Sequence, residues 1–402
     1  MTPAQLLKPV WLLGAGVSFP AVKLTTQQIT DRVLSGEGIT HHSSGSYYVN
    51  VPDLTDHMPD SVLRVVRFLC GLKAEAYKYF TPKPSVTYEH LYHLVSQIHD
   101  NESGDYENPA VSVFINETPL DIAPLLVGNG RGHSQTWDIL NLAREASNYI
   151  RDVVCGLLIN PIDTLEYLEC FRQAATDPDI AKTDIFTLNH DTLLENYLDQ
   201  RGVRYNNGFG PKINGLRYWN ADLLDSEPCR VRILKLHGSV NWFRLRHPEG
   251  DWSAEVTAMV LGPASWPLRR QDGGRWDCPE GRPMILAGTF NKMLSYTSGV
   301  FADLHCQFHH SLRRAETLIV CGYSFGDKGI NSRITEWIYS TSAKRLIVIH
   351  PEPDQLHNFA RPAIREKWEG WKRQGRLTVI PKLIEEVDWP EIKAAIMNTG
   401  PR

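Results

Sequence analysis

Asp184–Asn196 reads DIFTLNHDTLLEN, and this stretch is the strongest indication of the fold. Ile185–Leu188 is short, mostly apolar and partly β-branched, which is typical of a buried strand. Three polar residues, Asn189-His190-Asp191, follow at once, and an apolar pattern at helical spacing comes next. The stretch therefore predicts a strand that leads into a helix, and ligand crevices of parallel sheets lie at such strand ends. The alternative is that Asn189 and Asp191 only cap the helix.

Similar short apolar runs recur along the chain and predict further strands. They are the run before the glycines in Lys8–Gly16, then Arg232–Leu236, Pro283–Gly288, Thr317–Gly322, Arg345–His350 and Leu377–Ile380. Helical patterns lie between several of them. Short apolar strands that alternate with helices indicate an α/β fold with a Rossmann-like, doubly wound, mostly parallel sheet.

A long segment between the first two predicted strands of this sheet has helical periodicity instead. Its apolar residues recur at three- and four-residue spacing in Ser61–Tyr79, Val86–Ile98, Thr136–Ile159 and Thr164–Ala174. We therefore expect a helical insert at residues 54–180, within a nucleotide-binding domain made of residues 1–53 and 181–402.

Composition and charge narrow the class of protein. The chain has 402 residues, of which 42% are hydrophobic, and a net charge of −4. This balance gives no electrostatic reason to expect nucleic-acid binding. The sequence shows no apolar stretch of 18 residues and no signal-peptide pattern, so we expect a cytoplasmic protein without a membrane segment.

The cysteines argue against a structural metal site. All seven are scattered, and none forms a CxxC pair, so neither a disulfide framework nor a four-cysteine zinc site is expected. His305 and His309 stand one helical turn apart, a spacing that can bind a metal. No acidic partner follows them closely, and we expect no zinc.

Glycines follow the first predicted strand. A strand, the turn Gly14-Ala15-Gly16 and a helix starting near Thr25 or Thr26 form a cradle that can hold a phosphate. Such turns also occur for packing reasons. The third glycine of the usual dinucleotide fingerprint is missing, as is an acidic residue about 20 positions later, which disfavours an ordinary dehydrogenase.

Four strand ends carry distinctive motifs in an order that resembles the sirtuin family. They are GAGVS at Gly14–Ser18, TLNHD at Thr187–Asp191, LHGS at Leu236–Ser239 and GYSFGD at Gly322–Asp327. The longer forms KLHGSVNW and GYSFGDKGIN look more like divergent bacterial sirtuin-like proteins of antiphage defence than like protein deacylases. The resemblance covers about Lys8–Thr30 and Asp184–Pro351.

The resemblance implies a site that binds NAD as its substrate. Asn189 would bind the nicotinamide ribose, Asp191 would hydrogen-bond the carboxamide, and His237 would be the catalytic base. An unperturbed histidine titrates near pH ~6.5, which suits that role, although a structural histidine at a turn is the alternative. The remaining residues expected to contact NAD are Gly14, Ala15, Gly16, Ser18, Thr26, Thr187, Gly238, Ser239, Gly322, Ser324 and His350.

Departures from the family pattern decide between activities. Sirtuin deacylases carry an Asp-Phe-Arg segment where Phe19–Thr26 reads FPAVKLTT, and they usually carry a zinc module that this chain lacks. The sequence therefore favours an NAD glycohydrolase that releases nicotinamide and ADP-ribose, acting in antiphage abortive infection. The alternatives are an NAD-dependent protein deacylase and a non-catalytic module that senses NAD or ADP-ribose. The resemblance also implies a homo-oligomer, with a partner such as an ATPase or an Argonaute.

Overall fold

The computed structural model describes residues 6–51, 55, 58–79, 85–117, 139–159, 164–226, 228–246, 255–261, 277–289 and 291–397. Contacts group the chain into two compact units. The sheet unit is Met1–Lys23, Pro161–Pro279 and Met293–Arg402, and the helical unit is Leu24–Asn160 and Glu280–Lys292. The division predicted from the sequence, with an insert at 54–180, stays a prediction.

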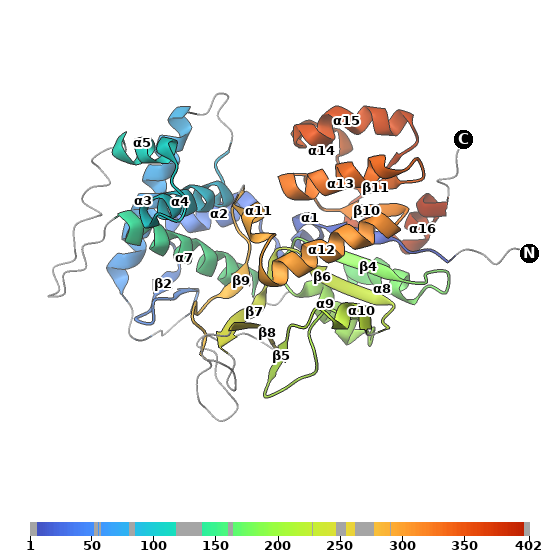
Figure 1. Cartoon of the computed structure of the whole chain (residues 1–402), viewed down its shortest axis with the longest axis horizontal. Helices are drawn as coiled ribbons and strands as arrows, with labels where there is room; N and C mark the ends of the chain where they lie inside the picture. Colours follow the sequence, from blue (N-terminus) through green and yellow to red (C-terminus); the bar gives the residue numbers. More distant parts are fainter. Residues whose placement is uncertain are drawn as a thin grey trace, which may run out of the picture. The chain divides into compact units, whose positions relative to one another are not determined.

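A six-stranded parallel sheet forms the centre of the sheet unit (Figure 1). Its strands are β1 (Val10–Leu13), β4 (Thr183–Thr187), β6 (Val231–Lys235), β10 (Thr317–Cys321), β11 (Arg345–Ile349) and β12 (Leu377–Ile380), in the order β12-β11-β10-β1-β4-β6. Taken from β6, the order is that of a Rossmann sheet, in which the chain changes direction between β1 and β10. The predicted fold class is confirmed.

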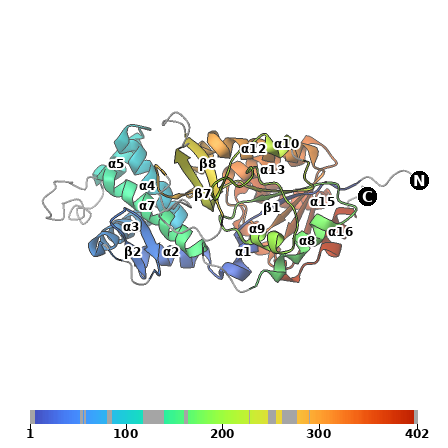
Figure 2. The ribbon, with the colours of Figure 1, turned by 90° about the horizontal axis from the view of Figure 1, so that it is seen from below.

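Alternating side chains on these strands enter two apolar layers. Trp11 and Leu13 of β1 belong to a buried cluster with Phe171 and Trp389, whereas Phe186 of β4 packs against Phe308 on the opposite face. Figure 2 shows α12 and α13 on one side of the sheet and α8, α9 and α16 on the other. Both faces are covered, which explains why the strands read as almost continuous apolar runs.

The helices of the sheet unit have the following bounds: α1 (Ala15–Val22), α8 (Glu169–Thr176), α9 (Leu193–Gln200), α10 (Leu223–Ser226), α12 (Gly299–Arg314), α13 (Lys328–Ser340), α14 (Pro353–Phe359), α15 (Pro362–Arg373) and α16 (Trp389–Met397). Short 3-10 turns are η2 (Glu166–Leu168) and η3 (Ile384–Glu386). Antiparallel strands β5 (Leu216–Tyr218), β7 (Gly238–Arg246) and β8 (Glu255–Val260) pair in the order β5-β8-β7.

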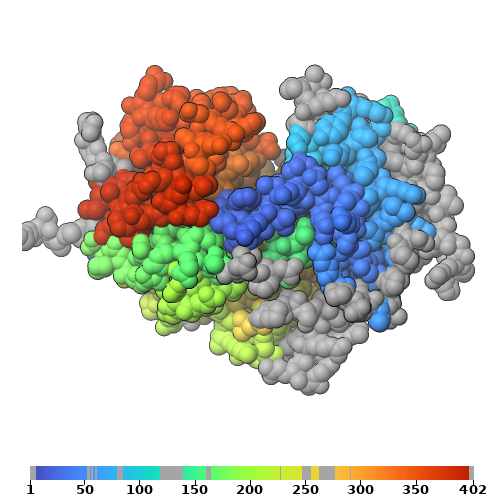
Figure 3. Space-filling view, turned by 180° about the vertical axis from the view of Figure 1, so that it is seen from behind, coloured from blue at the N-terminus to red at the C-terminus, as the bar shows by residue number. Residues whose placement is uncertain are grey.

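The C-terminal helix α16 packs beside α8, which lies near the middle of the sequence. In Figure 3 the red C-terminal segment lies directly beside the green segment that contains α8. The Trp389 indole N–H donates to the Asp177 carboxylate at 2.6 Å, and Lys393 forms an ion pair with the same carboxylate at 2.8 Å. Helix α16 therefore closes one apolar layer of the sheet.

The helical unit is built around α7 (Ile139–Leu158). Its other elements are α2 (Thr26–Ser35), β2 (Ile39–His41), β3 (Tyr47–Val49), α3 (Pro59–Tyr79), α4 (Tyr88–Ser103), α5 (Pro109–Glu117) and β9 (Pro283–Ile285); α11 (Lys292–Ser295) begins at its last residue. Buried Asp152 of α7 accepts the Tyr47 N–H at 2.9 Å and pairs with Arg282 at 3.0 Å. Burial raises the pKa of Asp152 to about 6.

Most predicted elements lie within a few residues of the observed ones. The prediction for Pro283–Gly288 needs correction, because its three-residue strand β9 lies outside the six-stranded sheet. An apolar run of that length cannot reveal which sheet it joins. Residues 136–138 of the predicted helix Thr136–Ile159 lie outside the described residues. Thr25 is the N-cap of α2, with a complete capping box, as one of the two predicted candidates.

Candidate active site

The turns after β1 and β10 touch at the point where the sheet changes direction. The Gly14 N–H donates to the Cys321 carbonyl at 3.0 Å, and the Gly16 N–H donates to the Gly322 carbonyl at 2.9 Å. A Cβ on Gly14 would lie 2.6 Å from the Gly322 oxygen, and one on Gly16 would lie 2.7 Å from the Gly322 Cα. Gly322 itself has a φ of +65°. Close approach of two backbones therefore explains these glycines; their contact with a diphosphate stays a prediction.

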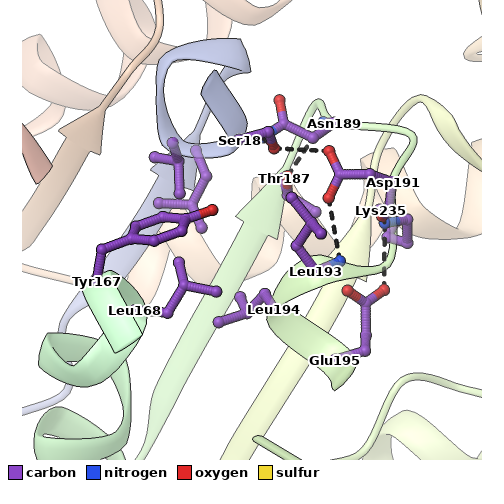
Figure 4. Close-up of a pocket in the computed structure, with 12 residues that line it drawn as sticks. Ser18, Tyr167, Leu168, Thr187, Asn189, Asp191, Leu193, Leu194, Glu195 and Lys235 are labelled. Atoms are coloured by element: carbon purple, nitrogen blue, oxygen red, sulfur yellow. Dashed lines mark hydrogen bonds and ion pairs between the residues drawn. The ribbon is translucent and has the colours of Figure 1, made fainter. Parts of the chain in front are cut away.

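Three side chains from β1–α1 and β4 form one hydrogen-bonded network. The Ser18 hydroxyl donates to Asp191 Oδ2 at 2.6 Å and accepts from the Asn189 amide at 2.7 Å. The same Asn189 amide also donates to the Gly14 carbonyl at 3.0 Å. Figure 4 shows Ser18, Asn189 and Asp191 turned toward one another beyond the end of β4. Residues 171 or more positions apart in the sequence are thus joined in one polar cluster.

Asp191 supports the start of α9, one of the roles that the sequence left open, and its contact with a ligand stays a prediction. Its Oδ1 accepts the Leu193 N–H at 3.1 Å, at the first turn of α9, while its Oδ2 accepts the Ser18 hydroxyl. Asn189 contributes nothing to that turn through its amide, which faces Ser18 and Gly14. One Asp191 oxygen therefore supports the start of α9. The Asn189 amide does not cap this helix.

A buried ion pair below Asp191 was missed by the sequence analysis. Lys235, at the end of β6, donates to the Asp191 carbonyl and lies 3.2 Å from the Glu195 carboxylate. Burial raises the pKa of Glu195, against the opposing charge of Lys235. A lysine at the end of an otherwise apolar strand was the available signal. The pair braces the turn that carries Asn189 and Asp191.

A small cavity opens beside this network. Its volume is about 10 Å³, and its lining includes Tyr167, Ser18, Asn189, Asp191 and Lys235 (Figure 4). That volume corresponds to roughly one water molecule. A dinucleotide, or its nicotinamide end, is far larger than this cavity.

His237 follows β6 and belongs to a second buried cluster. Its Nε2 lies 3.0 Å from the Tyr296 hydroxyl and 3.3 Å from Asp327 Oδ2. The Tyr296 hydroxyl donates to the same Asp327 oxygen at 2.6 Å. Asp327 is fixed in turn, because its Oδ1 accepts the Ile330 N–H at the start of α13. The His237 imidazole is therefore held from one edge by two oxygen atoms.

Charges in this cluster are unequal. Burial raises the pKa of the Asp327 carboxyl, but hydrogen bonds from His237 and Tyr296 and the charge of His237 outweigh it, so that the pKa lies well below its usual value. His305 of α12 stacks on Tyr296 at 3.6 Å between ring centres. Burial, with nearby His237, lowers the pKa of His305 to about 3. At neutral pH the cluster thus contains an anionic Asp327 and a neutral His305.

Tyr296 and His305 were not predicted as site residues. Tyr296 lies in an irregular stretch without a motif, and the sequence analysis considered His305 only as a metal ligand. Within the described residues, one group of side chains lies close enough together to share a metal ion. It consists of His99, Asp100 and Asp105, on α4 and just after it. His305 and His309 form no such group there.

The remaining predicted residues lie at several strand ends and helix starts. Buried Thr187 and Ser239 support the turns: the Thr187 hydroxyl accepts the Asn189 N–H at 3.1 Å, and the Ser239 hydroxyl donates to the His190 carbonyl at 3.2 Å. Gly238, the first residue of β7, adopts a φ of +79° directly after His237. Exposed Ser324 and half-buried His350 follow β10 and β11. Exposed Thr26 begins α2 in the helical unit, and Ala15 is exposed at the start of α1.

Comparisons with known proteins show similarity to SIR2-like proteins. Residues 183–372 match a family model described as a SIR2-like domain. No curated protein matches the chain. Similar solved structures include a Sir2 homologue in complex with NAD, with 13% identity, a TM-score of 0.40 and coverage of 99% of this chain and 92% of that one.

A second similar structure is a Sir2 homologue mutant in complex with ADP-ribose, with 13% identity, a TM-score of 0.39 and coverage of 98% of this chain and 94% of that one. At such TM-scores neither similarity supports a further conclusion. Within the described residues, no helix is long and apolar enough to cross a membrane. The match that spans β4 to α15, and with it the Asn189, His237 and Asp327 turns, supports a sirtuin-like family for this part of the chain.

Proposed function

We propose that the sheet unit is an NAD glycohydrolase, which cleaves NAD to nicotinamide and ADP-ribose with water as the acceptor. One observation carries the proposal: half-buried Asn189 and buried Asp191 after β4, and buried His237 after β6, are polar groups at the carboxyl edge of one parallel sheet. Neighbouring strands bring these turns together, since the Leu236 N–H donates to the Thr187 carbonyl at 2.9 Å. Ligands of doubly wound sheets bind at this edge.

The reaction needs a base for water, a group that orients the ribose and a group that holds the leaving carboxamide. This edge of the sheet offers a side chain for each. The bond between nicotinamide and C1′ of the ribose breaks with its electron pair leaving on the ring nitrogen, which turns a cationic pyridinium into neutral nicotinamide. A water oxygen bonds to C1′, and His237 accepts the proton that it loses. Asn189 orients the ribose, and Asp191 holds the leaving carboxamide. Peptide deacylation would need a groove for an acylated lysine, and no described feature favours one.

Ser18 controls access to these two side chains. Its hydroxyl now occupies the Asn189 amide and one Asp191 oxygen. NAD must replace these hydrogen bonds with its own, so the network represents the site without substrate, with Asn189 and Asp191 bonded to Ser18. A substrate hydroxyl and carboxamide would then pair with the Asn189 amide and the Asp191 oxygen in place of Ser18.

The test is the product profile of the purified chain incubated with NAD, with and without an acetylated peptide. Release of nicotinamide and ADP-ribose without peptide supports hydrolysis. Release that needs the peptide would establish a deacylase instead. Saturable NAD binding without release, at every protein concentration, would favour a sensing module.

The cellular role in this proposal is that of a cytoplasmic antiphage effector which acts through abortive infection. Its support is the motif resemblance together with a logical need: an unregulated NAD hydrolase would empty the NAD pool of its own cell. We expect a homo-oligomer whose turnover rises with a partner such as an ATPase or an Argonaute. Light scattering paired with turnover across protein concentrations tests this; a monomer with full, concentration-independent turnover that its host tolerates would contradict it.

A further inference from the structure

The proton positions around His237 follow from its contacts with two oxygen atoms and from the hydrogen bond between those two oxygens. Tyr296 has a single hydroxyl proton, and its 2.6 Å contact with Asp327 Oδ2 directs that proton to the carboxylate. The Tyr296 oxygen then faces His237 Nε2 with a lone pair, as does Asp327 Oδ2 at 3.3 Å. An unprotonated Nε2 would set its own lone pair against both oxygens. A proton on Nε2 instead donates to the Tyr296 oxygen and faces the Asp327 carboxylate.

We infer that Asp327 and Tyr296 are positioning residues that hold His237 in the tautomer with its proton on Nε2, so that Nδ1 is the proton-accepting atom. Asp327 then also stabilises the imidazolium that forms when Nδ1 takes a proton from water. No proton leaves the Asp327–Nε2 edge during this step. The inference specifies the base of the proposed hydrolysis and rests on it for the step at Nδ1, but the tautomer itself does not.

The geometry around Asp327 makes the substitution Asp327→Asn informative. Oδ1 caps α13 through the Ile330 N–H at 3.0 Å, and asparagine is an equally good cap. An asparagine that keeps the cap must place its amide NH₂ where Oδ2 was, facing His237 Nε2 and Tyr296. A donor at that place favours an unprotonated Nε2 and moves the proton to Nδ1. The variant therefore reverses the tautomer while the helix start is preserved.

The experiment is nitrogen-15 NMR of the full chain with labelled histidine, at a pH where the ring is neutral. The signal of His237, one of 15 histidines, is assigned by its loss in His237→Gln. We expect a protonated Nε2 and an unprotonated Nδ1 in the wild type, and the reverse in Asp327→Asn. Wild-type protein with the proton on Nδ1, or an Asp327→Asn spectrum identical to that of the wild type, would overturn the inference.

Activity gives a second readout. Asp327→Asn should lower kcat by roughly 10²–10⁴ with little change in KM, since it removes the base and no substrate contact. Tyr296→Phe keeps the ring that stacks on His305 and should lower kcat roughly tenfold. Asp327→Glu should restore part of the loss, and Asp354→Asn, at an exposed position in the first turn of α14, should match the wild type. A loss in Asp327→Asn that appears only in KM would contradict a positioning role.

The two proposals fail in different ways. If the wild type shows the Nε2 proton but never cleaves NAD, the proposed function fails and the tautomer inference stands. If the wild type cleaves NAD with the proton on Nδ1, the inference fails and the function stands.

Discussion

Strand β6 carries two buried charged clusters, one near each end, and they differ in what their charges can do. Near its start, Arg232 forms two hydrogen bonds of 2.6 Å with Asp184 of β4, and Ser311 donates to the same carboxylate at 2.7 Å. Beyond its end, His237 contacts Tyr296 and Asp327. Both clusters are buried and hydrogen-bonded.

Arginine keeps its charge at every accessible pH, and the fork of its guanidinium is matched by both Asp184 oxygens. Burial raises the pKa of Asp184, but the hydrogen bonds and charge of Arg232 have the larger, opposite effect. The pKa of Asp184 is therefore lowered, and the pair stays ionised. Histidine can gain and lose a proton near neutral pH. Burial of charge therefore does not identify a site; a partner that can exchange a proton at the ligand edge of the sheet does.

The largest expected effect separates the two clusters by activity. Asn189→Ala and His237→Ala should each lower NAD turnover by roughly 10²–10⁴, because in the proposed mechanism each removes a group that contacts the ribose or the attacking water. Melting temperatures should stay near that of the wild type. The matched controls are Asn196→Ala and His310→Ala, at exposed positions on α9 and α12. Near-full turnover in either site variant would remove that residue from the mechanism.

The opposite pattern is expected at the start of β6. Arg232→Met leaves the buried Asp184 carboxylate without its hydrogen-bonded cation, which should cost about 3–5 kcal/mol of unfolding free energy. Turnover per folded molecule should not change. Urea unfolding measures the loss of unfolding free energy. Turnover divided by the folded fraction measures the activity per folded molecule. A stable variant with lost turnover would mean that this cluster takes part in the site.

Ser311→Ala should have a smaller effect of the same kind. It removes a hydroxyl that donates to Asp184 and accepts from Arg232 at 3.0 Å. Hydrogen bonds to charged groups contribute about 1.5–3 kcal/mol, and Arg232 still neutralises the carboxylate. The same urea series, with exposed Ser332→Ala on α13 as control, checks the value. Equal losses for Ser311→Ala and Arg232→Met would show that the ion pair itself adds nothing.

Near neutral pH, the smallest effect is the acid response of the His237 cluster. The folded-state pKa of His305 is lowered to about 3 from an ordinary 6.5, so between these values the unfolded chain binds the extra proton and the folded chain does not. Stability is therefore full above pH 6.5 and falls as the pH drops, by at most about 1.4 kcal/mol per pH unit. His305→Gln should flatten this slope, whereas exposed His310→Gln should keep it. An unchanged slope in His305→Gln would assign the acid response to other groups.

Much of the sheet unit could be predicted because its signals are local. The runs at Ile185–Leu188 and Thr317–Gly322 are apolar on both faces, and Asn189 and Asp191 stand just where a strand ends. The link from Ser18 to both residues could not be predicted, since it depends on how α1 meets the end of β4. Sequence alone likewise gave no reason to pair Tyr296 with His237.

The glycines show the same limit from the other direction. Gly14 and Gly16 match a phosphate-binding pattern, yet both are also required where their turn meets Gly322. A one-dimensional pattern cannot distinguish close approach to a ligand from close approach to another turn. Pro283–Gly288 was misassigned to the main sheet for a related reason, because pairing partners are chosen by tertiary contacts.

The central claim is that Asn189 and His237 hydrolyse NAD at the carboxyl edge of the sheet, and a time course of both products tests it most directly. Purified wild-type chain and the pair Asn189→Ala and Asn196→Ala are incubated with NAD alone, and nicotinamide and ADP-ribose are quantified together. The account predicts equal amounts of the two products from wild type and Asn196→Ala, with release from Asn189→Ala reduced at least roughly 10²-fold. Unequal products, or equal release from Asn189→Ala and Asn196→Ala, would contradict it.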